Sequence, residues 1–339
     1  MFAKALKKVI NGDDLNQELM IHCMEKMMEG KIHDNQIASL LTALKMKGES
    51  VTELTAGAKV LRKKALTISD IPTDTLDTCG TGGDGSGTFN ISTAVALLSA
   101  AAGLKVLKHG NRSFSSLCGS ADVLEALGVR IDLSPEETAM CLKQTNFGFL
   151  LAPLYHKAVK NVMPVRKALG FRTIFNLLGP LVNPGGAKYQ LLGVYDENLT
   201  EVMAEVLRAL GVDRALVVHG KEGLDEISIT GSTIISELKE GYISSYEIHP
   251  EDFGIPLGRS GDITGGNAKK NGQIIKDIFQ GKLGAARDIL LMNAGAALYV
   301  GEKVSSMSEG IDVARKCIDE GLAYKKLQEI IQVSGGVTS

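Results

Sequence analysis

The hydrophobic pattern of the chain changes near residue 73, and this change separates two unlike parts. Upstream of it, apolar residues recur at the spacing of an amphipathic helix in Leu15–Met28 and in Ile37–Met46. No stretch of this part has the alternating pattern of a half-buried strand. The sequence therefore predicts a helical domain over residues 1–72.

Downstream, short apolar runs alternate with amphipathic segments. The runs predict strands at Thr75–Cys79, Lys105–Lys108, Arg130–Leu133, Phe149–Ala152, Gln190–Val194 and Ala215–His219. The amphipathic segments predict helices at Ser92–Ala102, Ala121–Leu127, Glu201–Leu210 and Ala285–Val300. This alternation favours a largely parallel sheet with helices on both faces. We therefore predict an α/β fold: a small helical N-terminal domain and a large α/β domain, residues 73–339, with a mainly parallel sheet.

Polar residues at the predicted helix starts indicate where individual helices begin. We expect Asp14 and Asp34 to cap the first two helices, and Ser120 to cap a later one. Ser50 is followed three residues later by a glutamate, and the motif SPEE that begins at Ser134 adds a proline at the first helical position. Both arrangements predict a capping box.

Net charge and cysteine content argue against several classes of protein. The formal net charge is −2, which gives no support for a general nucleic-acid or membrane-surface binder. The five cysteines are scattered and contain no Cys-x-x-Cys pair, so neither a zinc site nor a disulfide framework is expected. No apolar run reaches the length of a membrane span, and the first residues lack the apolar stretch of a signal peptide. We expect a cytoplasmic protein with no membrane and no nucleic-acid partner.

A glycine-rich segment between the first predicted strand and the next helix is the strongest candidate for a ligand site. It runs from Asp77 to Thr93 and holds five glycines in the eight residues from Gly80 to Gly87. Glycine permits positive φ, so consecutive N–H groups can converge on an anion, and the following helix N-terminus adds positive potential. The spacing differs from a Walker loop and from the dinucleotide Gly-x-Gly-x-x-Gly motif. The segment predicts a phosphate or pyrophosphate cradle; the alternative is a tight turn that uses glycine for steric reasons alone.

A second polar loop, KHGNRSFSS, begins at Lys108 directly after a predicted strand. Lys108 offers a positive charge to a phosphate, and Ser115, Ser116 and Ser120 offer hydroxyl groups. Because ligands bind outside the carboxyl ends of parallel strands, we expect this loop and the glycine loop to face one crevice. The alternative is a solvated loop in which the histidine is structural.

Two adjacent carboxylates, Asp225 and Glu226, follow the last predicted strand. Magnesium takes oxygen ligands and usually binds through substrate phosphates, so acids beside a phosphate crevice suit it. Adjacent acids are also common on solvated surfaces. Taken alone, this pair is therefore compatible both with a magnesium site and with a solvated surface.

Together these loops resemble the anthranilate phosphoribosyltransferases. The glycine loop, the KHGNR loop, the run SADVLEALG and the stretch Arg166–Pro184 match that family in order and spacing over nearly the whole chain. The resemblance implies a nucleoside phosphorylase/phosphoribosyltransferase-like fold and a homodimer formed through the helical domain, which part of residues 165–185 would join. It also implies transfer of the phosphoribosyl group of 5-phosphoribosyl 1-pyrophosphate to the amine of anthranilate, in tryptophan biosynthesis, with two magnesium ions per subunit.

The resemblance carries roles onto matching positions of this sequence. It implies that phosphoribosyl pyrophosphate binds Gly80, Gly83, Asp84, Thr88, Asn90, Ile91, Ser92, Thr93, Lys108, Ser115, Ser116 and Ser120. It implies that anthranilate contacts Gly80, His109, Asn111, Arg166, Gly179 and Pro180, and that magnesium is held by Ser92, Asp225 and Glu226. Lys108 and Arg166 are the residues expected to act in catalysis. Arg166 can form a bidentate pair with the anthranilate carboxylate.

The chain departs from the family pattern beside the second loop. Leu117-Cys118 stands where members usually have a basic residue and then serine, and Phe114 is bulky for its place. The nearest alternative is a pyrimidine nucleoside phosphorylase, which has related loops but is not expected to carry the Arg166–Pro184 stretch. A non-catalytic nucleic-acid-binding relative would need a basic surface, which the net charge does not favour.

Overall fold

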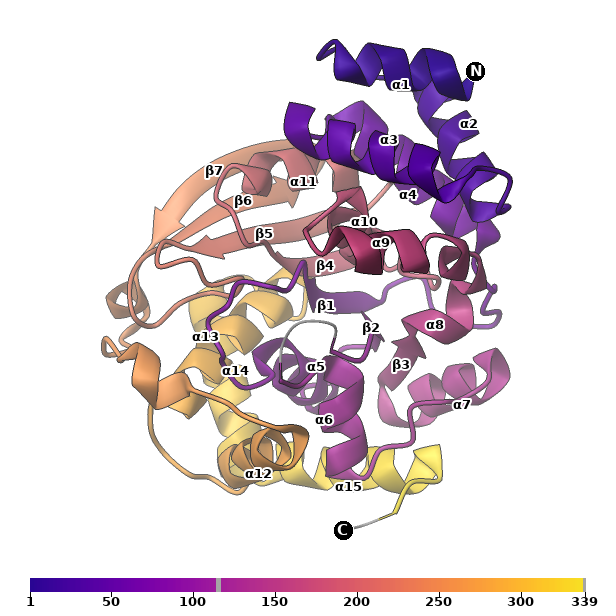
Figure 1. Cartoon of the computed structure of the whole chain (residues 1–339). Helices are drawn as coiled ribbons and strands as arrows, with labels where there is room; N and C mark the ends of the chain where they lie inside the picture. The colour runs from indigo at the N-terminus through magenta and orange to yellow at the C-terminus, as the bar shows by residue number, and fades with distance from the viewer. Residues whose placement is uncertain (114–116, 338–339) are drawn as a thin grey trace.

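The computed structural model describes residues 1–113 and 117–337, and one seven-stranded sheet forms its centre (Figure 1). The strands are β1 Leu76–Gly80, β2 Val106–Gly110, β3 Phe147–Leu151, β4 Tyr189–Gly193, β5 Arg214–Gly220, β6 Thr233–Lys239 and β7 Tyr242–Ile248. Their order is β3-β2-β1-β4-β5-β6-β7. β1 to β5 are parallel, whereas β6 and β7 are antiparallel. The predicted mainly parallel sheet is confirmed.

Helices cover both faces of the sheet. Those of the large part are α5 Ile91–Ala101, α6 Ser120–Leu127, α7 Pro135–Thr145, α11 Leu199–Ala209, α12 Ala268–Phe279, α13 Ala285–Val300, α14 Met307–Asp319 and α15 Leu322–Ser334. In β5, Leu216 and Val218 pack into the core with α5 and α13, while Ala215 and Val217 pack into a second core with α11. Burial on both faces explains why this strand is a continuous apolar run.

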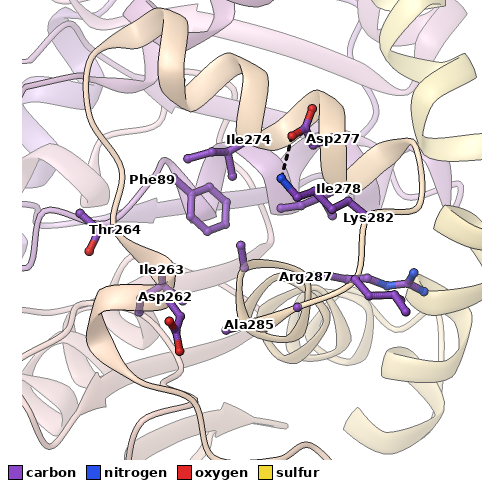
Figure 2. A pocket seen from close by; sticks show the side chains of 13 residues that line it. Phe89, Asp262, Ile263, Thr264, Ile274, Asp277, Ile278, Lys282, Ala285 and Arg287 are labelled. Atoms are coloured by element: carbon purple, nitrogen blue, oxygen red, sulfur yellow. Dashed lines mark hydrogen bonds and ion pairs between the residues drawn. The ribbon is translucent and has the colours of Figure 1, made fainter.

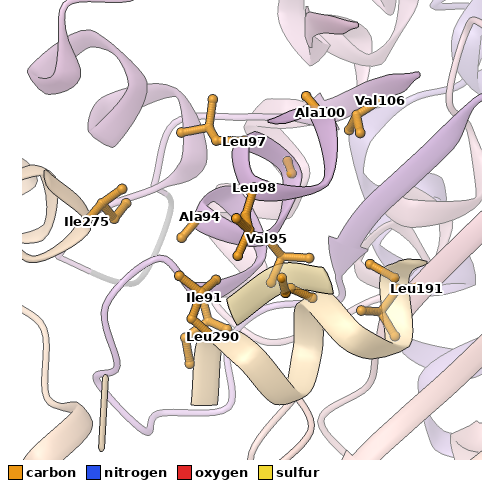
Figure 3. Close-up of a cluster of buried hydrophobic side chains, with 14 of the residues drawn as sticks. Ile91, Ala94, Val95, Leu97, Leu98, Ala100, Val106, Leu191, Ile275 and Leu290 are labelled. Carbon is orange, nitrogen blue, oxygen red and sulfur yellow. The ribbon is translucent and has the colours of Figure 1, made fainter. Parts of the chain in front are cut away.

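The core on the α5 side holds the glycine-rich segment from behind. In Figure 3, Ile91 and Val95 of α5 lie near Leu290 of α13 and Leu191 of β4. α5 begins at Ile91, whose side chain is only 1% exposed, so it is an apolar anchor beneath the loop.

Within the described residues, no helix is both long enough and apolar enough to cross a bilayer.

Four helices form the N-terminal part, α1 Phe2–Ile10, α2 Gln17–Met28, α3 Asp34–Lys47 and α4 Val51–Lys64. Three short helices from the middle of the chain are α8 Ala152–Tyr155, α9 Met163–Leu169 and α10 Ile174–Leu178. α9 contacts α3, and α10 contacts both α3 and α4 (Figure 1). Segments far apart in sequence thus share one apolar cluster.

Two of the predicted N-terminal caps are wrong. The side chain of Asn16, not that of Asp14, accepts the hydrogen bond at the start of α2. Asp14 accepts from Lys47 Nζ instead, 2.5 Å away. α3 is preceded by His33, and Asp34 is already its first residue. At Asp14, the ion pair with Lys47 takes the place of the local capping contact.

The start of α6 also differs from the prediction. Gly119 precedes the helix and Ser120 is its first residue, while Asp122 Oδ2 accepts from the Gly119 N–H at 2.8 Å. The capping boxes that begin at Ser50 and Ser134 are both confirmed.

The predicted strand Arg130–Leu133 is absent. Its alternate residues Ile131 and Leu133 are buried, so the apolar pattern is satisfied by packing against the core. Its backbone is not in a ladder, because the Arg130 N–H donates to Ser334 Oγ near the C-terminus at 3.2 Å. An alternating pattern reports burial on one side and does not by itself require a neighbouring strand.

The β6–β7 hairpin was not predicted. Glu240 and Gly241 connect the two strands, with φ of 52° and 81°. Two consecutive residues with positive φ form the type I′ turn that suits a hairpin, but this turn usually carries Asn-Gly or Asp-Gly. Because glutamate stands at the first position of this turn, the sequence lacks the dipeptide that would have predicted the hairpin.

The strand order brings four loops together at one side of the sheet, where the carboxyl-terminal ends of the parallel strands lie. From β1 the chain adds β2 and β3 on one side and then returns to add β4 and β5 on the other. Ligands in open α/β sheets bind at such a reversal, outside the carboxyl ends of the strands. The segments that follow Gly80, Gly110, Gly193 and Gly220 all leave the sheet at this edge, as the sequence predicts for the glycine, KHGNR and acidic loops.

Candidate active site

The glycine loop, residues 81–90, leaves β1 with its backbone open. Gly82, Gly83, Gly85 and Gly87 all have positive φ, between 65° and 75°. Among the described residues nothing lies within 4 Å of a Cβ built on Gly82, Gly85 or Gly87. Glycine is therefore not required at these three positions for close packing. It is required by the backbone conformation, which favours a loop that presents its backbone to a ligand over a purely steric turn.

A segment from the far end of the chain supports the loop from outside the crevice. Thr88 pairs with Thr264 in an isolated antiparallel bridge, and the Gly265 N–H donates to Gly87 O at 2.9 Å. Asn271 Nδ2 of α12 donates to Asn90 Oδ1 at 2.9 Å. Asn90 Nδ2 in turn donates to Cys118 O, at 3.1 Å, so Asn90 links the glycine loop to the end of the KHGNR loop.

Behind the loop is a small cavity of about 210 Å³ (Figure 2). Phe89 points into it toward Ile274 and Ile278 of α12. Three of its charged residues already have partners, since Lys282 binds Asp277 at 3.0 Å and Arg287 binds Asp319 of α14 at 2.6 Å. None of the predicted site residues lines it. This cavity is the packing support of the glycine loop and lies apart from the crevice.

Lys108 is buried beneath the start of α5. Its side chain is 1% exposed, and Nζ donates to Thr78 O and, at 3.3 Å, to Ser92 Oγ. Burial lowers the pKa of Lys108, and the nearby carboxylate of Asp77 opposes that shift. Lys108 therefore places its charge under Ser92 and does not project into open solvent.

Asp77 and Asn183 were missed as part of this arrangement. Asp77 is fully buried and accepts from the His109 N–H at 3.2 Å and from Asn183 Nδ2 at 2.8 Å. Asn183 also donates to Leu107 O at 2.8 Å. The two residues therefore fix β2 on both sides of Lys108, at Leu107 and at His109. Their position inside the glycine segment and inside the Arg166–Pro184 stretch was the available signal.

The acidic pair faces the glycine loop and the start of α5. Asp225 Oδ2 accepts from the Gly82 N–H at 2.9 Å, and Glu226 Oε1 accepts from the Ser92 N–H at 3.1 Å. Burial raises the pKa of Asp225 to about 7, and the neighbouring Asp84 adds to the shift. Burial and then Asp225 raise the pKa of Glu226, whereas Lys108 lowers it. This is not a solvated acidic surface.

Two half-buried carboxylates side by side fit a divalent cation, because neither forms a salt bridge among the described residues. No cluster of three or more His, Cys, Asp or Glu side chains suitable for a metal occurs in the part of the chain that the structure describes. Magnesium commonly binds one or two carboxylates and completes its ligands with water and substrate phosphates. The donor set therefore fits magnesium that arrives with a phosphorylated substrate.

A larger cavity, of about 510 Å³, opens beside the glycine loop between the sheet edge and the short helices α8 to α10. Its lining includes all six residues expected to contact anthranilate, namely Gly80, His109, Asn111, Arg166, Gly179 and Pro180. Gly80, the last residue of β1, and Thr81, the first residue of the glycine loop, both line this cavity. The structure brings these six residues from distant segments into one cavity, and their roles stay predictions.

Arg166, in α9, is the cation of this cavity. Its guanidinium lies over the Phe175 ring, with Cζ 5.2 Å from the ring centroid, and Nη1 contacts Met163 Sδ at 3.6 Å. Across residues 1–113 and 117–337, no carboxylate forms a salt bridge with it. Burial lowers the pKa of Arg166. A half-buried guanidinium without a counter-ion suits an anionic ligand.

His156, which the sequence did not single out, lies in the same cavity as His109. The two rings meet edge to face with centroids 5.1 Å apart. Burial, and next the neighbouring His156, lower the pKa of His109 to about 3, and burial also lowers the pKa of His156. The buried Nε2 atoms of both have no hydrogen-bond partner within the described residues. Both imidazoles are neutral at pH 7 and keep a polar atom available.

Arg172 was also missed. Its Nη2 donates to Gly83 O, and its Cζ lies 3.9 Å from the centroid of the Tyr195 ring. Arg172, in the segment before α10, thus ties the glycine loop to Tyr195, two residues after the end of β4. Arg172 belongs to the Arg166–Pro184 stretch, but the order of residues in that stretch does not predict what its side chain contacts.

The remaining predicted site residues have unequal access. Ile91 and Thr93 are buried, so a ligand would reach their backbone at the start of α5 and not their side chains. Ser120 Oγ exchanges hydrogen bonds with the Asn111 backbone. Asp84 accepts from the Ser86 N–H at 3.2 Å within the loop. Ser115 and Ser116, which are predicted to contact the substrate, and Phe114, which departs from the family pattern, lie outside the described residues.

Comparison with known proteins agrees with this geometry. Residues 72–324 match the a/b domain of a glycosyl transferase family, and residues 3–65 match the helical bundle domain of a glycosyl transferase family. The chain is 55% identical, over 98% of each sequence, to the anthranilate phosphoribosyltransferase of Alkaliphilus metalliredigens.

Solved structures give the same picture. The anthranilate phosphoribosyltransferase of Thermus thermophilus superposes with a TM-score of 0.92 at 39% identity, covering 98% of this chain and 99% of that one. The enzyme of Saccharomyces cerevisiae in complex with PRPP and Mg superposes with a TM-score of 0.89 at 26% identity, covering 98% of each chain. The same yeast enzyme has been solved in complex with 4-fluoroanthranilate. This chain belongs to the anthranilate phosphoribosyltransferase family.

Proposed function

We infer that the chain transfers the phosphoribosyl group of 5-phosphoribosyl 1-pyrophosphate to the amine of anthranilate, giving N-(5-phosphoribosyl)anthranilate and pyrophosphate, a step of tryptophan biosynthesis. One observation carries this inference. The cavity that holds the uncompensated Arg166 guanidinium opens at Gly80, where the glycine loop begins and Asp225 approaches. A site for an organic anion and a site for a metal-bound diphosphate thus meet at one residue.

Phosphoribosyl pyrophosphate would bind along the glycine loop and the start of α5. We propose that backbone groups of the loop and of Ser92 and Thr93 receive its phosphates, with Gly83, Asp84, Thr88 and Asn90 around them. Lys108 contributes from below, because its ammonium is bonded to Ser92 Oγ and adds positive potential to the helix N-terminus. Ser120, the first residue of α6, would contribute its hydroxyl group.

Magnesium would be held by Asp225, Glu226 and Ser92, and we propose two ions per subunit. When bound, magnesium neutralises charge that develops on the leaving pyrophosphate. Replacing the pair by Asp225→Asn and Glu226→Gln keeps the side-chain shapes and removes the negative charge. We expect the double variant to need at least ten times more magnesium for half-maximal rate, while its melting temperature without ligand is unchanged or higher. Parental activity at the parental magnesium concentration would make this assignment wrong.

Anthranilate would occupy the 510 Å³ cavity with its carboxylate on Arg166. Its amine would face Gly80 and Asn111, toward the ribose. Because the amine is neutral at pH 7, no strong base has to remove a proton before attack. The lowered pKa values of His109 and His156 make both imidazoles weak bases, which is consistent with this requirement. The chain's own contribution is mainly to orient the two substrates and to stabilise charge.

A pyrimidine nucleoside phosphorylase is the alternative that shares these loops. It would take inorganic phosphate and a neutral pyrimidine nucleoside, which offers carbonyl acceptors but no negative charge to the arginine of the organic pocket. The deciding assay follows anthranilate fluorescence after addition of phosphoribosyl pyrophosphate and magnesium, in parallel with thymidine and phosphate. We expect fluorescence loss and no thymine. Thymine release without fluorescence loss would replace our inference by the alternative.

We further propose a cytoplasmic homodimer in which the first helices form the contact. Exposed apolar side chains support this surface, with Ile10 at the end of α1 65% exposed and Met46 at the end of α3 84% exposed. The packing of α9 and α10 on α3 and α4 supports a discontinuous helical domain, 1–72 joined by part of 165–185. Sedimentation of the protein and of an Ile10→Asp, Met46→Asp variant would separate dimer from monomer.

A further inference from the structure

We propose that Asn293, on α13, is a positioning residue that fixes the acidic pair for its metal. It is fully buried next to the pair and lines neither of the two cavities described above. The inference rests on the magnesium site proposed above. It concerns a residue that neither sequence pattern nor resemblance singled out.

Asn293 is fully buried in a helix whose neighbouring residues are apolar. Its Oδ1 accepts from the Ile227 N–H at 2.9 Å, and its Nδ2 donates to Ile227 O at 2.8 Å. Nδ2 also donates to Ile289 O, one turn earlier in α13, at 2.9 Å. One amide therefore binds both backbone groups of the residue that follows Glu226.

This clamp is needed because the acidic pair lies in a loop and not in the sheet ladder. β5 ends at Gly220, and the loop turns back so that the Gly220 N–H donates to Leu224 O at 2.8 Å. The loop then runs against β4, where a Cβ built on Gly193 would lie 1.6 Å from Asp225 O. Gly193 thus contacts the loop at Asp225, and Asn293 holds it at Ile227, the residue after Glu226.

Two like-charged carboxylates repel each other, and their loop would relieve the repulsion by moving toward solvent. The Ile227 side chain is fully buried, and its backbone groups have the Asn293 amide as partner. Removing that amide leaves a buried N–H and C=O to find other partners, which costs free energy unless the loop shifts. A shift of about 1 Å is enough to spoil a metal site.

A merely structural role for Asn293 predicts a different outcome. If the amide only satisfies buried backbone groups, its removal lowers stability and leaves metal affinity unchanged. If it positions the pair, metal affinity falls by more than stability loss in the same helix explains. Partners one shell away from metal ligands change affinity by about 10–100-fold.

The experiment titrates Mn²⁺ calorimetrically into the full chain with pyrophosphate present, for the parent, Asn293→Ala and Leu298→Ala. Leu298 is a fully buried residue of α13 with no bond to the acidic loop, so it is the matched control for lost stability. We expect Asn293→Ala to raise the Kd for Mn²⁺ at least ten-fold, while the KM for anthranilate stays parental. Leu298→Ala should lower the melting temperature and keep the parental Kd.

Parental Mn²⁺ affinity in Asn293→Ala, or an equal rise in Leu298→Ala, would overturn the inference. If Asn293→Ala does not fold, Asn293→Ser carries the same expectation and the same refuting result. The double variant of Asp225 and Glu226 is measured alongside. If it keeps parental Mn²⁺ affinity, the proposed metal site fails; if it loses affinity while Asn293→Ala does not, only the role of Asn293 fails.

Discussion

A guanidinium in a largely apolar cavity is costly to leave without a counter-ion, and Arg166 occupies that position. Its ring contact with Phe175 sets its direction but supplies no negative charge. At the scale of one residue, the site is therefore defined by the absence of a carboxylate partner for Arg166 among the described residues. The same reasoning does not apply to Arg112, which already binds Glu125 at 2.5 Å.

We expect Arg166→Ala to lower kcat/KM for anthranilate by an amount equivalent to about 2–5 kcal/mol, because a buried charged hydrogen-bonding partner is lost. The KM for phosphoribosyl pyrophosphate should change much less. Steady-state kinetics with each substrate varied in turn measures both. Arg315→Ala, on α14, where the guanidinium already binds Asp312 at 2.6 Å, is the control with no expected effect on anthranilate. An unchanged anthranilate KM and kcat in Arg166→Ala would remove it from the site.

Leu117 stands where the family usually has a basic residue, and its side chain is 83% exposed. It precedes Cys118, whose carbonyl accepts from Asn90 of the glycine loop. We expect Leu117→Lys to tighten binding of phosphoribosyl pyrophosphate by about 1 kcal/mol at low salt, and by less at high salt, since an exposed charge is screened. Calorimetric titration at two ionic strengths tests this, with Leu322→Lys on α15 as the control. Equal affinity at low salt would show that residue 117 does not face the substrate.

At the scale of elements, the glycine loop works because strand, loop and helix are joined without a strained non-glycine residue. Gly82 has φ of 65° and donates to Asp225. Alanine in this left-handed conformation costs about 1–2 kcal/mol. The loop would relieve that cost by changing conformation, since nothing described packs against the site of the added methyl group.

We therefore expect Gly82→Ala to raise the KM for phosphoribosyl pyrophosphate about ten-fold or more, with a small change in melting temperature. Gly211→Ala is a matched control, because Gly211 also has positive φ, 78°, and open space, but it lies in the turn between α11 and β5. It should lower stability by a similar amount and leave both KM values parental. If the two variants behave alike in kinetics, the loop backbone is not a ligand.

At the scale of the whole molecule, His109 and His156 join the sheet edge to the short helices at the back of the organic pocket. His109 has a folded-state pKa of about 3, below its ordinary value of 6.5. The unfolded chain therefore binds more protons between pH 3 and pH 6.5. The contribution of this residue to stability is present above pH 6.5 and is lost as the pH falls through that window.

His109→Gln cannot take up a proton, so it should remove part of this pH dependence. We expect the free energy of unfolding of the parent to fall between pH 7 and pH 5 by about 2 kcal/mol more than that of the variant, at about 1.4 kcal/mol per pKa unit. Urea unfolding at both pH values measures it. His33→Gln, at an exposed helix start, should leave the parental difference. A parental difference in His109→Gln would mean that this imidazole accepts a proton in the folded state.

The sequence by itself determined the local features of this protein. Apolar period alone located α13 and, to within a few residues, β1 to β5, because burial of one side or both sides leaves a direct pattern in neighbouring residues. The capping boxes at Ser50 and Ser134 and the left-handed glycines of the loop are likewise decided within a few residues. Arg130–Leu133 shows the limit, since its alternation is real but Ser334 replaces a neighbouring strand.

Only the tertiary structure decided which side chains act together. Asn183 meets Asp77 across 106 residues of chain, Arg172 meets Gly83 across 89, and Asn293 meets Ile227 across 66. Buried polar groups need partners, but any loop that reaches them will satisfy them, so no pattern of nearby residues names the partner. The order of strands around β1 and β4 selects those partners, because it brings the loops to one edge.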